Sequence, residues 1–96
     1  MRTAARVDSN QHAVVAAFRK LGWAVAHTHT IGKGFPDLVI SRGDYTALVE
    51  VKDSSQPPSR RRLTPDEQVF HAQWPGHIHI VESVDDVIRL SSTYPH

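Results

Sequence analysis

The sequence predicts one small α+β or mixed α/β domain built on a single sheet, and two observations lead to that fold class. Periodic segments follow one another in the order helix, three strands, helix, strand, helix. The 96 residues, 40% of them hydrophobic, suit one domain spanning 1–96 with its core at about 8–90. The chain holds no cysteine, so a disulfide scaffold is excluded.

In the first half of the chain we expect a helix and three strands. Residues 8–10 (Asp, Ser, Asn) supply N-cap side chains, and apolar residues recur at helical spacing before Gly22, which predicts a helix over about 10–21. Alternation predicts a strand over 23–29. Two further strands, 37–42 and 45–52, flank Gly43-Asp44, a two-residue hairpin signal with positive φ at its first position.

The second half begins with a polar, proline-rich segment, 53–63, which we expect to be a mobile basic loop. Thr64-Pro65-Asp66-Glu67 then combines an N-cap, a proline at the first helical position and a glutamate three residues after the cap. This pattern predicts a helix to about Trp74. A short strand over 77–81 and a final helix from Ser83 to about Leu90 complete the domain.

The formal net charge of +1 hides a strong asymmetry along the chain. Residues 1–62 carry ten basic and five acidic side chains, a net of +5, whereas residues 63–96 carry one basic and five acidic side chains, a net of −4. Such polarity indicates a half that faces nucleic acid. The alternative is a solvated surface on which charges are scattered by chance.

Neither a membrane nor export is expected. No apolar stretch approaches the roughly 20 residues that span a bilayer. The first six residues, Met-Arg-Thr-Ala-Ala-Arg, lack the apolar core of a signal peptide. We therefore expect a cytoplasmic location.

The hairpin signal fixes which residues face each other. If Gly43 and Asp44 form the loop, paired residue numbers sum to 87, so Asp37 lies directly opposite Glu50. Their Cβ atoms would be about 4.5–5.5 Å apart, and Lys52 would share their face. The opposite face would carry apolar core residues: Leu38, Ile40, Ala47, Val49 and Val51.

Two carboxylates placed opposite each other are destabilising unless something offsets their charge. Mg²⁺ is commonly bound by one or two carboxylates, with waters and substrate phosphate oxygens as its other ligands. A lysine beside such an ion can position the attacking water and stabilise developing charge. The pattern of Asp37, Glu50 and Lys52 therefore predicts metal-assisted phosphodiester hydrolysis. The alternative is that Asp37 is a turn residue and that Glu50 and Lys52 form a solvent-facing ion pair.

Two segments resemble the PD-(D/E)xK nuclease signature: Gly34-Phe35-Pro36-Asp37-Leu38-Val39-Ile40 and Leu48-Val49-Glu50-Val51-Lys52. Together with Leu63-Thr64-Pro65-Asp66-Glu67-Gln68, the layout over residues 8–90 resembles the small stand-alone VRR-NUC branch of that superfamily. The resemblance implies a restriction-endonuclease-like αβββαβ core with a C-terminal helix. It also implies a Mg²⁺ or Mn²⁺ requirement, DNA hydrolysis, and a homodimer acting on branched DNA such as Holliday junctions.

The resemblance also assigns roles to individual residues. Asp37 and Glu50 correspond to the metal ligands, Lys52 to the catalytic lysine, and the carbonyl of Val51 to the usual backbone ligand.

Related nucleases often place an acidic ligand on the first helix, where this chain has Asn10 and Gln11, with Asp8 just ahead. We favour Gln11 as the counterpart, although a neutral amide weakens the case for a second tightly bound ion. A polar residue that supports the site is also common on the second helix, and Gln68 is the candidate, with Glu67 beside it.

Basic residues near the predicted site are candidates for DNA contacts. Lys33 lies between two glycines, where the backbone can approach a phosphate closely. Arg60, Arg61 and Arg62 follow the catalytic strand on the basic loop and could clamp a phosphate backbone. The alternatives are an ordinary exposed lysine and a solvated charge run.

Histidines occur in two pairs spaced two residues apart on predicted strands: His27 with His29, and His77 with His79. Four converging imidazoles could bind Zn²⁺, although the absence of cysteine makes that less favoured. Alternatively, they line the DNA surface and become cationic at mildly acidic pH.

Symmetric cutting of a junction needs two active sites, so we expect a twofold dimer that buries apolar residues such as Trp74, Ile78 and Ile80. The rival interpretation is a non-catalytic nucleic-acid-binding module, or a nuclease subunit that needs a partner for specificity.

Overall fold

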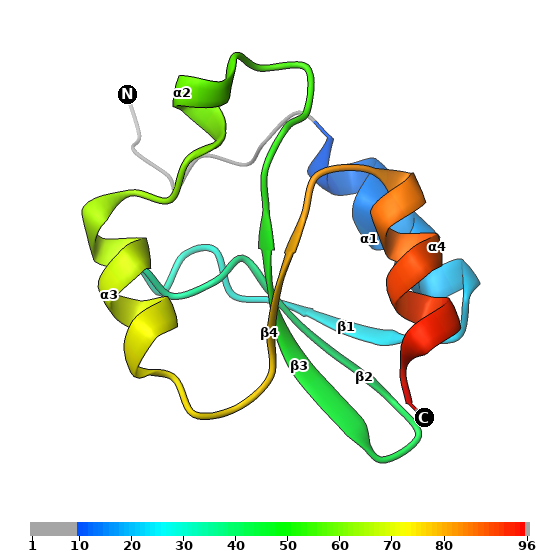
Figure 1. The fold of residues 1–96 in the computed structure, drawn as a ribbon. Helices are drawn as coiled ribbons and strands as arrows, with labels where there is room; N and C mark the ends of the chain where they lie inside the picture. Colours follow the sequence, from blue (N-terminus) through cyan, green and yellow to red (C-terminus); the bar gives the residue numbers. More distant parts are fainter. Residues whose placement is uncertain (1–9, 96) are drawn as a thin grey trace.

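A computed structural model describes residues 10–95 of the chain as a four-stranded sheet with helices on both sides (Figure 1). The elements in chain order are α1 Gln11–Lys20, β1 Ala24–His27, β2 Leu38–Arg42, β3 Tyr45–Val51, α2 Pro58–Arg61, α3 Pro65–Gln73, β4 Ile78–Val81 and α4 Val84–Thr93. The predicted α+β fold with a mixed sheet and a C-terminal helix is confirmed.

The strands lie in the order β1-β2-β3-β4. β1 pairs with β2 and β2 with β3 in antiparallel fashion, whereas β3 and β4 are parallel. The parallel pair needs a crossover connection, and residues 52–77, which contain α2 and α3, provide it.

The register of the β2–β3 hairpin is the one predicted from its two-residue loop. Arg42 pairs with Tyr45, and Leu38 pairs with Val49, so every pair sums to 87. Gly43 has φ +63°, the left-handed conformation that the turn requires. Asp37 precedes the first residue of β2, so its place in this register is opposite Glu50.

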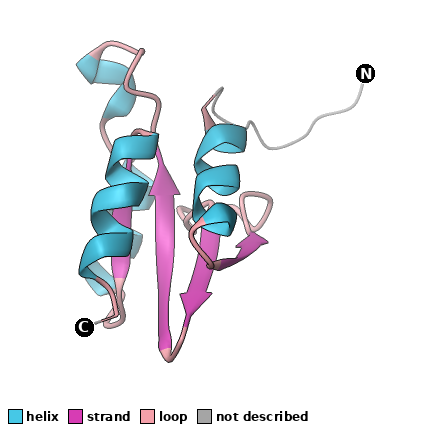
Figure 2. Cartoon of the chain, turned by 90° about the vertical axis from the view of Figure 1, so that its right-hand side faces the viewer, coloured by secondary structure: helices cyan, strands magenta, loops and turns pink. Residues whose placement is uncertain are grey.

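The hydrophobic core lies between the sheet and two helices, α1 and α4, which cover the same side of it (Figure 2). The predicted inward-facing residues of β2 and β3 are buried there, and Phe18 of α1 and Val87 of α4 pack onto them. α3 lies on the other side of the sheet (Figure 1). Glu50 alternates with Val49 and Val51 and therefore faces the α3 side.

The prediction that 53–63 is a loop without regular structure is wrong at α2. Pro58 occupies the first helical position, where its fixed φ is compatible with a helix and its missing N–H costs nothing. The amide of Arg60 donates to the Pro57 carbonyl at 2.8 Å. Ahead of α2, the buried Asp53 carboxylate accepts hydrogen bonds from the amide and hydroxyl of Ser55.

Helix boundaries otherwise follow the predicted caps. Thr64 forms a complete capping box with Glu67 at the start of α3, and the Ser83 side chain accepts from the Asp86 amide at the start of α4. α4 extends to Thr93, one turn beyond the predicted end. Among residues 10–95, no helix has the length and apolar character needed to cross a membrane.

Candidate functional site

Two carboxyl groups meet on the α3 side of the sheet, as the hairpin register predicts. Glu50 projects from β3 and is only 3% exposed. The Asp37 carboxylate accepts a hydrogen bond from the Val51 amide at 2.8 Å, and its other polar contact is a side-chain hydrogen bond with Glu50. The amide of Thr28 donates to the Asp37 carbonyl, which holds the backbone ahead of β2 in place.

The Glu50 carboxyl group is strongly perturbed. Burial, the hydrogen bond with Asp37 and the negative charges of Asp37 and Glu67 raise the pKa of Glu50 to about 10, against an opposing effect of Lys52. This raised pKa favours the protonated, uncharged form of Glu50 at neutral pH when no divalent cation is bound. Its Oε1 atom is buried and has no hydrogen-bond partner.

Lys52 lies between two acidic side chains. Its Nζ is 3.9 Å from Oε2 of Glu50 and 2.8 Å from Oε1 of Glu67. The same Glu67 oxygen accepts the Thr64 amide at 2.9 Å, which is one half of the capping box of α3. Burial alone would raise the pKa of Glu67, but the hydrogen bonds from Lys52 and Thr64 outweigh it and lower that pKa.

His71 is a second α3 residue at the site. Its Nε2 lies 3.9 Å from Oε1 of Glu50, and both atoms are buried without a hydrogen-bond partner. Burial lowers the pKa of His71, which favours the neutral imidazole. Sequence reasoning missed His71 and treated Glu67 mainly as a cap. Their i, i+4 spacing, which places both on one face of α3, is the signal that could have found them.

Gln68 is placed differently from its neighbour. The side chain is exposed and its Nε2 donates to the Leu63 carbonyl at 3.0 Å. Glu67, not Gln68, is therefore the α3 residue in contact with Lys52.

The start of α1 is tied to the end of β3 by Asn10. Its Nδ2 donates to the carbonyls of Lys52 and Glu82, each at 2.9 Å. Gln11, the candidate first-helix ligand, is 2% exposed, and its Nε2 has no hydrogen-bond partner. Asp8 lies outside the described residues.

The basic candidates lie in the loop before β2 and in or beside α2. Lys33 is exposed and has φ +56°. Its loop packs closely on α3, because a Cβ on Gly34 would overlap the Asp66 carbonyl. In and beside α2, Arg60 and Arg62 are exposed, whereas Arg61 contacts Glu82 at 3.4 Å.

The two histidine pairs do not converge, so the four-histidine zinc site is wrong. His27 lies in β1 and His79 in β4, which are opposite edges of the sheet. His79 instead forms a 2.8 Å hydrogen bond with the Tyr45 hydroxyl. Within the described part of the chain, no three His, Cys, Asp or Glu side chains form a metal-binding group.

The donors at Asp37 and Glu50 nevertheless suit a hard divalent cation. They are two carboxyl groups, hard oxygen donors of the kind that bind Mg²⁺ together with water and substrate. The observation that supports this fit is the buried Oε1 of Glu50, which has no hydrogen-bond partner among residues 10–95 and whose neighbour His71, 3.9 Å away, favours the neutral imidazole.

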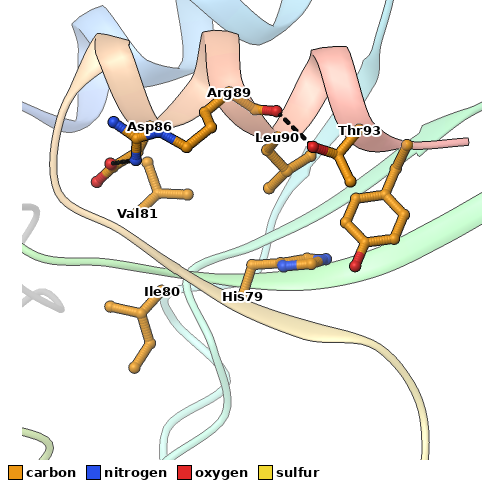
Figure 3. Close-up of a pocket in the computed structure, with 8 residues that line it drawn as sticks. His79, Ile80, Val81, Asp86, Arg89, Leu90 and Thr93 are labelled. Carbon is orange, nitrogen blue, oxygen red and sulfur yellow. Dashed lines mark hydrogen bonds and ion pairs between the residues drawn. The ribbon is translucent and has the colours of Figure 1, made fainter.

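A different pocket, of about 230 Å³, lies between β4 and α4 (Figure 3). His79, Val81 and Leu90 line it together with the Asp86–Arg89 ion pair, whose atoms are 2.8 Å apart. His79 and Val81 face the α4 side of the sheet, so this pocket is separate from the carboxyl cluster.

The fold and site thus define an α+β domain with a mixed sheet and a buried carboxyl cluster beside a lysine. No family model, curated protein or solved structure matches the chain.

Proposed function

We propose that the protein is a Mg²⁺- or Mn²⁺-dependent DNA endonuclease of the PD-(D/E)xK type, similar to the VRR-NUC family. The observation that carries this proposal is the buried Glu50 carboxyl, held against Asp37 with one oxygen unpartnered and with Lys52 beside it. Holding the buried Glu50 carboxyl against a second carboxyl group, with the Lys52 ammonium no nearer than 3.9 Å, is costly for folding alone, which favours a cation-binding role.

Asp37, Glu50 and the Val51 carbonyl would hold the metal, with Gln11 as a further candidate. When bound, the ion supplies polarisation of the phosphodiester and a lower pKa for the attacking water. Lys52 contributes positive charge next to the reacting phosphate. Glu67 orients the Lys52 ammonium, and His71 lines the site next to Glu50 as a neutral imidazole.

DNA, rather than a small phosphodiester, is the proposed substrate because of the charge distribution. Residues 1–62 carry a net charge of +5, and among them Lys33, Arg60 and Arg62 are exposed. We propose these residues, with Arg61, as contacts to phosphates, which bind without reading sequence. Branched DNA is the proposed preferred form.

A homodimer would provide the two active sites that a junction requires. β4 pairs with β3 on one side only, so its outer edge is free among the described residues, and Ile80 on it is 47% exposed. A twofold axis at this edge would join two sheets into one.

The second candidate is a non-catalytic nucleic-acid-binding module or a nuclease subunit that depends on a partner. It is favoured by the internal bonding of the site, since Asp37 already accepts the Val51 amide and Lys52 already binds Glu67.

Cleavage assays distinguish the two candidates. The purified protein is incubated with Mg²⁺ or Mn²⁺ and linear, flapped or four-way DNA, alongside the variants Asp37→Asn and Lys52→Ala. The endonuclease proposal requires metal-dependent cleavage by the unchanged chain and a loss of at least a hundredfold in both variants, while DNA binding persists. Arg89→Ala, on α4, is the matched control and should cleave normally. If the unchanged protein cuts none of the substrates, the binding-module candidate replaces the enzyme.

A further inference from the structure

An apolar slot of about 150 Å³ opens between β3 and the turn that follows α3. It is lined by Thr46, Ala47, Leu48, Trp74, Gly76 and His77. The volume is below the roughly 300–1,000 Å³ of typical small-molecule sites, so the slot suits one planar group rather than a whole ligand.

Trp74 is a rigid wall of this slot. Its ring stacks on Phe70 with centroids 5.2 Å apart and an angle of 18°, and Phe70 in turn contacts Phe35 at 5.1 Å. A Cβ on Gly76 would come within 2.9 Å of the indole Nε1, so glycine leaves room for the ring at this position. Trp74 is still 39% exposed, although Phe70 covers one of its faces. The indole is therefore held in place with a free surface toward the slot.

The slot and the proposed metal site share one face of β3. Leu48 and Glu50 are two residues apart, so their side chains project from the same face about 7 Å apart along the strand. Lys33 lines a second pocket with Asp66 and Phe70, and Phe70 is the ring on which Trp74 stacks. The aromatic stack thus connects the slot to a pocket that contains a lysine, and β3 connects the slot to the carboxyl cluster.

We infer that this slot binds a single unpaired nucleobase stacked on Trp74, next to the phosphate held at the Glu50 site. This inference rests on the proposed nuclease function. A base is the only part of DNA with an apolar planar face, and the neighbouring positive charge complements the phosphates on either side of it. Bases stacked in a duplex have both faces covered, so only an unpaired or extruded base can enter. The slot therefore selects strands with an unpaired nucleotide beside the cleaved bond.

Tryptophan fluorescence tests the inference directly, because the chain has two tryptophans and Trp23 is buried in the core. Asp37→Asn protein in EDTA is titrated with a single-stranded oligodeoxynucleotide and with a hairpin duplex of the same sequence. We expect quenching by the single strand that is much weaker with the duplex. Trp74→Phe should abolish the quenching but keep affinity within about threefold, whereas Trp74→Ala should weaken binding roughly 5- to 150-fold.

Two variants serve as controls. Val84→Ala, at an exposed position on α4 outside the slot and outside the Lys33 pocket, should leave binding unchanged. Thr46→Phe, at an exposed strand position, should fill the slot without removing the indole, and it keeps the inference testable if Trp74→Ala does not fold. Equal binding of single strand by the unchanged chain, Trp74→Ala and Thr46→Phe would overturn the inference. So would Trp74 fluorescence that changes with protein concentration alone, which would assign the slot to a second copy.

Failure of the slot and failure of the nuclease give different results. A protein that cleaves DNA but whose Thr46→Phe variant binds and cuts normally retains the proposed function and loses the slot. A protein that cleaves nothing but binds single strands through Trp74 loses the nuclease assignment and retains the base-binding slot.

Discussion

The protonation state of Glu50 links the stability of the protein to the proposed metal site. In the free protein its pKa is raised to about 10, mainly by burial. Between its ordinary value near 4.5 and about 10, the folded state therefore binds a proton that the unfolded chain has lost. The stabilisation that the folded state gains by keeping Glu50 protonated is fully present below pH 4.5 and is lost as pH rises toward 10. A divalent cation needs the ionised form, so it competes with that proton.

Glu50→Gln should therefore change stability in a pH-dependent way. Glutamine resembles the protonated acid and does not ionise, so the metal-free variant should melt several degrees higher than the unchanged chain at pH 8–9 and at nearly the same temperature at pH 4. Thermal unfolding followed by circular dichroism in EDTA across this pH range measures the difference.

Metal addition provides the complementary measurement. Mg²⁺ or Mn²⁺ should raise the melting temperature of the unchanged protein increasingly with pH, and should not do so for Glu50→Gln. Asp44→Asn, at the exposed hairpin turn, controls for loss of a negative charge. A Glu50→Gln variant that is destabilised equally at pH 4 and pH 9 would show that Glu50 makes a structural contact instead.

For individual residues, the sequence is sufficient to predict a contact when that contact depends only on local backbone geometry. A two-residue loop fixes a hairpin register, and the Gly43-Asp44 signal therefore placed Asp37 opposite Glu50. The contacts of Glu67 and His71 depend on how α3 docks against the sheet across a 26-residue crossover, and no local pattern determines that docking. The sequence pattern also does not distinguish Glu67 from Gln68 as the α3 residue at the site, because the choice depends on which face of α3 docks against the sheet.

Among the elements, α3 uses one residue, Glu67, both to cap its own N-terminus and to contact Lys52. The Oε1 atom of Glu67 accepts the Thr64 amide within the capping box and also the Lys52 ammonium. The N-terminus of α3 is thereby joined to Lys52 at the end of β3. The cap was predicted from Thr64-Pro65-Asp66-Glu67, but its connection to the site was not. At α2, Pro57 and Pro58 predict a loop from the sequence alone. Proline is also common at the first position of a helix, however, and Pro58 occupies that position.

Thr64→Ala should weaken this connection. It removes the hydroxyl that accepts the Glu67 amide at 3.2 Å, and N-cap losses of this kind cost about 0.5–2 kcal/mol. Urea unfolding should show that loss, and Thr64→Ser, which retains the hydroxyl, should stay within about 0.5 kcal/mol of the unchanged chain. Because Glu67 also orients Lys52, cleavage by Thr64→Ala should fall severalfold while cleavage by Thr64→Ser should not. Equal stability of the alanine and serine variants would contradict the role of the cap.

For the whole molecule, the structure accounts for much of the negative charge in the second half of the chain. Asp66 and Glu67 lie in the first turn of α3, and Asp85 and Asp86 in the first turn of α4, where negative charge favours the helix dipole. These four acids therefore have local structural roles. The near-neutral total charge combines this acidic half with a basic half that contains the proposed site.

The free edge of β4 carries the last prediction, which concerns assembly. Sedimentation at high protein concentration should give about twice the 10.7 kDa chain mass if two copies join their sheets at this edge. Ile80→Lys should restore a monomer, because a lysine on an edge strand opposes pairing with a second sheet. Ile88→Lys is the matched control, since Ile88 is 49% exposed, close to the 47% of Ile80, but belongs to α4 and not to the edge strand. That variant should remain a dimer. A monomeric unchanged chain would refute the two-site arrangement, and a dimer that Ile80→Lys leaves intact would place the interface elsewhere.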